Sequence, residues 1–129
     1  MNAMLFLFAV LIGIFSVSAN QQCEELTIGN GAQTVTKNGG ITVKFLELIE
    51  DSRCPEGANC IWAGVAKIKV RLSKNGKAEV FDLNTNQREK TAIFQGYSFA
   101  LDALNPYPST TSKYSPSAYK ATIEVSKAP

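Results

Sequence analysis

The stretch VAKIKVRLSKNGKAEVFDL, residues 65–83, decides the fold of this chain. Apolar residues occupy its even positions from Ala66 to Leu72, and basic residues occupy the odd positions between them. Side chains of a β-strand point alternately to opposite faces, so this pattern is typical of a strand with one buried and one solvated face. Asn75 and Gly76 then tolerate the positive φ angles of a type I′ turn, so the stretch predicts a hairpin joining residues 65–74 to residues 77–83.

The same alternation recurs on both sides of this hairpin, in ITVKF (41–45), YSFALDAL (97–104) and YKATIEV (119–125). In YSFALDAL it directs Tyr97, Phe99, Leu101 and Ala103 toward the buried face. Turn residues at Asn30-Gly31 and at positions 38–40 separate further runs. The predicted strands span residues 24–28, 33–36, 41–50, 65–73, 78–83, 97–104 and 118–126, with a shorter one at 91–95.

About seven short strands without an amphipathic helix predict an all-β fold. We expect an antiparallel β-sandwich with the general architecture of immunoglobulin domains, because each strand has one apolar face to bury against a second sheet. A small β-barrel is the alternative.

The first nineteen residues, MNAMLFLFAVLIGIFSVSA, are apolar from position 4 to position 17 and end in the small residue Ala19. This pattern predicts a secretory signal peptide at residues 1–19. Residues 20–129 then form a single β-domain, which we expect to be secreted or periplasmic. No segment after position 19 is apolar enough to span a membrane.

The amino-acid composition of the chain excludes several classes of function. The chain carries 13 Lys and Arg against 11 Asp and Glu, and the lysines are spread without a basic stripe, so we expect no nucleic-acid binding. It has no histidine, which excludes Ser-His-Asp and Cys-His catalysis and histidine-ligated zinc. We therefore predict no catalytic residue, no metal and no cofactor.

Two of the three cysteines lie in DSRCPEGANCIWAG, residues 51–64. CPEG predicts a β-turn with Pro55 at its second position and Gly57 at its fourth, which folds the chain back. Because disulfides form in exported proteins, we predict a Cys54–Cys60 disulfide. The spacing is wrong for a redox Cys-x-x-Cys pair, and a zinc site lacks a fourth ligand. Cys23 is left over and could link two chains through a disulfide.

The same loop carries the candidate binding residues. Trp62, the single tryptophan, either packs against the disulfide and the core edge, which we favour, or stands exposed as an anchor. Arg53 either pairs with Glu50 or Asp51, which we favour, or contacts a partner. The second long loop, residues 105–117, contains three prolines, and its Tyr107 is expected to cover the core at a proline-fixed corner or to line a groove. The predicted partner-binding face comprises Arg53, Pro55, Glu56, Trp62 and Tyr107.

These features predict a non-enzymatic binding or structural module whose partner is a protein or a glycan. A cysteine-bracketed loop that inhibits a protease is one alternative. The other is an enzyme acting on glycans with two carboxylates, for which Glu50, Asp51 and Glu56 are the nearby candidates.

The loop also resembles a motif of small exported bacterial proteins of uncharacterised function, D-S-R-C-P-x-G-x-x-C-I-W-A-G. YSFALDALNPYP and the closing YKATIEVSK resemble the L-x-P-Y-P segment and last strand of the same proteins. The resemblance implies a secreted or periplasmic β-domain, sometimes lipid-anchored, but no activity or cofactor. It implies a shared loop structure at Asp51, Ser52, Arg53, Cys54, Pro55, Gly57, Cys60, Trp62 and Gly64, and Cys23 lies outside the motif.

Overall fold

The computed structural model describes Gly13, residues 23–86 and residues 91–129. The predicted signal peptide, residues 1–19, lies outside the described residues apart from Gly13. Within the described part of the chain, no helix is long and apolar enough to cross a bilayer.

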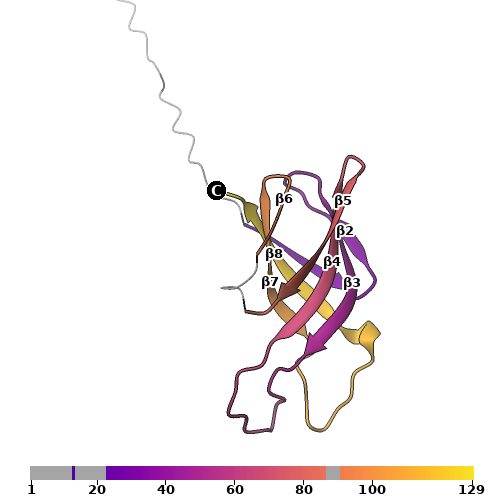
Figure 1. Ribbon diagram of the computed structural model, residues 1–129, viewed down its shortest axis with the longest axis vertical. Helices are drawn as coiled ribbons and strands as arrows, with labels where there is room; N and C mark the ends of the chain where they lie inside the picture. Colours follow the sequence, from indigo (N-terminus) through magenta and orange to yellow (C-terminus); the bar gives the residue numbers. More distant parts are fainter. Residues whose placement is uncertain (1–12, 14–22, 87–90) are drawn as a thin grey trace, which may run out of the picture.

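The described residues form two four-stranded antiparallel sheets packed face to face (Figure 1). One sheet has the strand order β1-β8-β7-β6 and the other β2-β3-β4-β5. The strands are β1 (Glu24–Gly29), β2 (Gln33–Val35), β3 (Thr42–Asp51), β4 (Ala66–Lys74), β5 (Lys77–Asn84), β6 (Ala92–Phe94), β7 (Tyr97–Asn105) and β8 (Lys120–Lys127). The predicted antiparallel sandwich is confirmed. The sheets do not close on each other in the described residues, so the barrel alternative is wrong.

Strand order follows chain order in the sheet β2-β3-β4-β5, whereas in the other sheet β6, β7 and β8 are consecutive neighbours and the first strand, β1, pairs with the last, β8. The chain changes sheets between β1 and β2 and again between β5 and β6. The similarity to immunoglobulin domains therefore extends to two packed antiparallel sheets, and the Greek-key connections of those domains are replaced by successive hairpins.

The hairpin predicted at positions 65–83 is confirmed as β4 and β5. Asn75 and Gly76 have φ angles of 50° and 80°, as a type I′ turn requires. The turn closes directly on the Lys74–Lys77 pair, and the register continues to Lys67 opposite Asn84. This pairing leaves β4 at the centre of its sheet, between β3 and β5.

The core lies between the two sheets and matches the predicted alternation. The four even positions of β4, 66 to 72, are all fully buried. Opposite them, β7 and β8 contribute Phe99, Leu101 and Ile123, which are equally inaccessible. Phe81 and Phe94 meet edge to face with ring centroids 6.4 Å apart, which joins the two sheets near β5 and β6.

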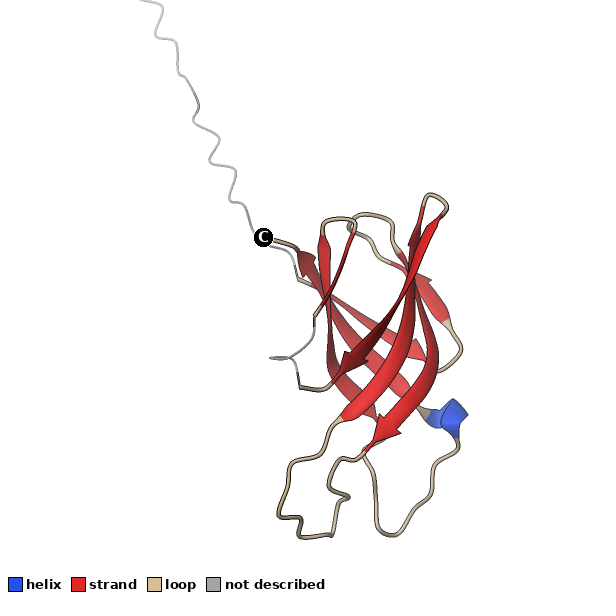
Figure 2. Cartoon of the chain, viewed as in Figure 1, coloured by secondary structure: helices blue, strands red, loops and turns tan. Residues whose placement is uncertain are grey.

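Two predicted details are wrong. The pairing of β7 with β8 shifts register between Leu101 and Ala103, so a bulge turns Leu104 rather than Ala103 into the core. The last strand begins at Lys120 instead of 118, because Pro116–Ala118 form a short 3₁₀ helix, drawn as the blue turn in Figure 2. The short strand predicted at 91–95 is confirmed as β6.

Candidate functional site

Two long loops lie side by side at one end of the sandwich, at the bottom of Figure 1. One connects β3 to β4 through residues 52–65, and the other connects β7 to β8 through residues 106–119. A parallel bridge between Glu56 and Ser109 joins them. The Glu56 N–H donates to the Pro108 carbonyl at 2.9 Å, and the Glu56 carbonyl accepts from the Thr110 N–H at 3.4 Å and from its hydroxyl at 3.2 Å. We call them the paired loops.

Arg53 holds the paired loops to the sheet. Its Nε and Nη2 donate to the two carboxylate oxygens of Asp51, at 2.8 and 2.9 Å. Its Nη1 donates to the Leu104 carbonyl at 2.6 Å, and Nη2 also donates to the Pro106 carbonyl at 3.2 Å. The ring of Tyr107 covers the guanidinium, with 4.6 Å between the guanidinium carbon and the ring centroid. We call these contacts the Arg53 clamp.

The clamp settles the two interpretations of Arg53. The pairing with Asp51 is confirmed, but it is internal: the two side chains are only 6% and 11% exposed. Arg53 as a whole is 8% exposed, so the structure shows the internal pairing and leaves little of this side chain on the surface for a partner. The reason is that strand β7 ends next to it and offers carbonyl oxygens that a guanidinium can satisfy simultaneously.

The predicted Cys54–Cys60 disulfide is present, with Cα atoms 5.8 Å apart. The turn inside it falls one residue later than CPEG predicts, because the Ala58 N–H donates to the Pro55 carbonyl at 3.2 Å. Gly57 is then the third residue of the turn and has a φ of 85°, which the third position of a type II turn requires and glycine provides.

Ser52 and Gly64 close the base of the first loop. The Ser52 N–H and hydroxyl both donate to the Val65 carbonyl, at 2.9 and 3.0 Å, and the hydroxyl accepts from the Val65 N–H at 3.0 Å. A Cβ at Gly64 would overlap the Ser52 carbonyl group and lie 2.8 Å from the Arg53 nitrogen. Only glycine permits this approach of the two chain segments.

Ile61 and Trp62 follow the disulfide and face solvent. Ile61 is 96% exposed and Trp62 is 63% exposed. The favoured interpretation, in which Trp62 caps the core edge, is therefore wrong, and the alternative of an exposed aromatic side chain is what the structure shows. The space over the end of the sheets is taken instead by the Arg53 clamp and the second loop.

The other predicted contact residues occupy different environments. Pro55 is partly buried, whereas the Glu56 side chain is exposed although its backbone forms the bridge between the loops. Tyr107 is 43% exposed, and one face of its ring lies on Arg53 rather than on the apolar core. The structure thus brings together Arg53 and Tyr107, while the side chain of Trp62 is exposed next to Ile61.

A hollow of about 260 Å³ opens beside the clamp. Its lining is formed by Arg53, Gly64, Thr85, Asp102, Ala103, Leu104, Asn105 and Tyr107. Sequence reasoning missed Thr85, Asp102 and Asn105, because one follows β5 and the other two belong to β7, and no local spacing connects them.

The carboxylates near the loop do not converge on one point. Both oxygens of Asp51 accept hydrogen bonds from Arg53, and the side chains of Glu50 and Glu56 are exposed. Across residues 23–86 and 91–129, no three His, Cys, Asp or Glu side chains gather closely enough to hold a metal ion.

Comparisons with protein families, with curated proteins and with solved structures found no significant match to this chain. The resemblance to small exported bacterial proteins therefore stays a prediction. The structure nevertheless gives physical reasons for much of the loop sequence: Asp51 and Arg53 form the clamp, Ser52 and Gly64 close the base, and the two cysteines pair. Ile61 and Trp62 are the large apolar side chains of the loop that face solvent.

Proposed function

We propose that this chain is an exported, non-enzymatic binding module that captures a partner protein with Ile61 and Trp62. The observation that supports the proposal is their exposure, 96% and 63%, on a loop held by a disulfide, the Arg53 clamp and the bridge to the second loop. Export rests on the predicted signal peptide.

The loop is fixed by three independent restraints: the disulfide, the Arg53 clamp and the bridge to the second loop. A loop that is ordered before binding loses little conformational entropy when a partner docks, so more of its contact energy becomes affinity. Tryptophan is enriched among residues that dominate binding energy, and burying each of these two side chains would contribute about 2–3 kcal/mol.

Ile61 favours a protein over a glycan as the partner. A tryptophan alone could stack on a sugar ring, but an almost fully exposed isoleucine offers nothing to hydroxyl groups. An apolar pocket of another protein would remove both side chains from water.

The decisive experiment compares two double variants. Ile61→Ala with Trp62→Ala removes the proposed anchor, whereas Val80→Ala with Ile93→Ala removes two other exposed apolar side chains, 51% and 59% exposed, elsewhere on the sandwich. Each purified protein is used to capture partners from the envelope and medium of the producing cells, with identification by mass spectrometry.

We expect the first variant to lose a protein that the unchanged chain and the second variant both retain. Because Trp62 is the single tryptophan, its fluorescence should shift to shorter wavelength when the isolated partner is added. The proposal is abandoned if both variants retain the same partners, or if only glycans are captured.

Protease inhibition is a narrower version of the same proposal. The exposed Ile61-Trp62 segment directly follows Cys60 of the disulfide, which is how a rigid loop could enter a protease cleft. A panel of proteases assayed with the unchanged chain and the Trp62→Ala variant tests it, and inhibition that does not depend on Trp62 would reject it.

A further inference from the structure

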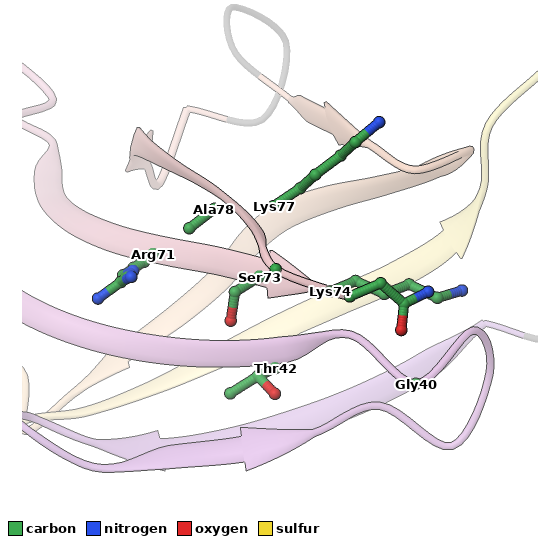
Figure 3. A pocket seen from close by; sticks show the side chains of 9 residues that line it. Gly40, Thr42, Arg71, Ser73, Lys74, Lys77 and Ala78 are labelled. Carbon is green, nitrogen blue, oxygen red and sulfur yellow. The ribbon is translucent and has the colours of Figure 1, made fainter.

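A second hollow lies beside the turn between β4 and β5. Figure 1 shows this turn at the end of the sandwich opposite to the paired loops. Its volume is about 310 Å³. Its lining residues, shown in Figure 3, are Gly40, Thr42, Arg71, Ser73, Lys74, Asn75, Gly76, Lys77 and Ala78. Three of them are cationic and none is acidic, so the hollow is positively charged.

Hydrogen-bond donors accompany these charges. Thr42 and Ser73 are direct partners in the register of β3 and β4, so both hydroxyl side chains lie on the same face of the sheet, one across from the other (Figure 3). Arg71 precedes Ser73 by two positions and therefore points to that face as well. One face thus presents a guanidinium and two hydroxyl groups next to the hairpin turn.

The neighbouring row of side chains on this face carries two positive charges and no negative charge. Lys44 is the direct partner of Arg71, and the row continues with Gln33 on β2 and Val80 on β5. Like charges placed directly opposite each other destabilise a sheet. In the described residues neither Lys44 nor Arg71 has an ion pair.

The next row along the same strands shows the contrast. There Lys69 lies between Glu47 and Asp82 in the register, and its ammonium group is 3.3 Å from the Glu47 carboxylate. The acid nearest to the hairpin turn on β5, Glu79, is the partner of Leu72 and so belongs to the other face. Lys69 therefore has carboxylates as its direct partners in the sheet, whereas Arg71 has none.

We propose that this hollow binds a phosphate group carried by a soluble or a lipid ligand. A guanidinium offers paired N–H donors that fit two phosphate oxygens, the hydroxyl groups of Thr42 and Ser73 add further contacts to a tetrahedral oxyanion, and the lysines add positive charge around it. Occupation would also relieve the repulsion between Lys44 and Arg71. The site is separate from the paired loops, so both ends of the sandwich could be occupied simultaneously.

The test is an NMR titration of the isotope-labelled protein with pyrophosphate, and separately with vesicles of phosphatidylglycerol and phosphatidylcholine against pure phosphatidylcholine vesicles. We expect saturable changes of the amide signals of Ser73, Lys74 and Gly76. Binding of pyrophosphate supports a soluble source of the phosphate, and binding confined to phosphatidylglycerol vesicles supports a lipid headgroup.

Two double variants of equal charge separate a site from general attraction. Arg71→Ala with Lys74→Ala should weaken binding about tenfold. Lys67→Ala with Lys69→Ala removes two charges from the same strand away from the hollow and should change affinity less than about twofold. Circular dichroism verifies that both variants fold. Equal losses in the two variants, shifts located elsewhere, or no saturable shift with any probe would each overturn the proposal.

Discussion

Replacement of Arg53 by alanine tests whether the clamp or a partner determines the role of this residue. Truncation removes the donors of four side-chain hydrogen bonds, two of them to Asp51 and two to the carbonyls of Leu104 and Pro106. The Asp51 carboxylate would then be left in a position where it is only 11% exposed and has lost its cation.

Breaking a buried ion pair by removing one partner costs about 3–5 kcal/mol. Water can still reach the edge of Asp51, so we expect the lower end, about 3 kcal/mol of unfolding free energy. For a domain of this size that corresponds to a fall in Tm of about 12 °C. Arg53→Lys keeps the charge but not the paired donors, and should lose about half as much.

Urea unfolding followed by far-UV circular dichroism measures this difference, with the slope against urea expected to stay constant. Arg71→Ala is the matched control, because Arg71 is exposed and has no ion pair in the described residues. It should change stability by less than about 0.5 kcal/mol, and Trp62→Ala should be similarly mild because its side chain is 63% exposed. An Arg53→Ala protein within about 1 kcal/mol of the unchanged chain would refute the clamp.

Gly64→Ala should lower the free energy of unfolding by about 2–4 kcal/mol in thermal unfolding, because an added Cβ forces the two segments of the loop base apart. Gly29→Ala is the control and should lower it far less, because a Cβ there meets no atom within 4 Å. Equal losses in the two variants would contradict this account. Reduction of the disulfide should cost about 2 kcal/mol in urea unfolding, and no change would show that the loop closure contributes nothing. A hydrogen bond to Glu124, minor desolvation and the Glu124 charge raise the pKa of the Cys23 thiol. Alkylation of Cys23 should therefore be slow at neutral pH and should accelerate as the pH rises and the thiolate forms. Glu124→Gln should increase the alkylation rate at neutral pH. An alkylation rate that does not change in this variant would reject the contact between Cys23 and Glu124. The proposed Cys23-linked dimer should form in non-reducing gels only at alkaline pH or with added oxidant, and should be absent in Cys23→Ser.

Much of the fold was predictable because its signals are local. The alternation in β4 and the Asn75-Gly76 turn depend on side-chain direction and on φ, which a few neighbouring residues determine. The disulfide could also be predicted from the sequence, since the two cysteines are close together along the chain. The bulge that places Leu104 in the core was not predictable, because it adds one residue without altering the surrounding pattern.

The site was predicted only in part. The loop itself, the pairing of Arg53 with Asp51 and the disulfide agree with expectation. Whether Arg53 and Trp62 face inward was not predictable: the arginine is buried, and the tryptophan is exposed although the packed position was favoured. The hollow near the hairpin was missed, because it depends on which residues of β3 and β4 share a row.

By itself, the sequence determined the strands, the hairpin, the two-sheet class of fold and the stapled loop, since each follows from residues that are neighbours along the chain. Only the tertiary structure decided which side chains of the loop face inward. The end of β7 lies beside residue 53 in space, although about fifty positions separate them in the chain, and it supplies the carbonyl oxygens that draw the guanidinium in. With that space filled and the loop base closed at Gly64, the indole of Trp62 is left in the solvent.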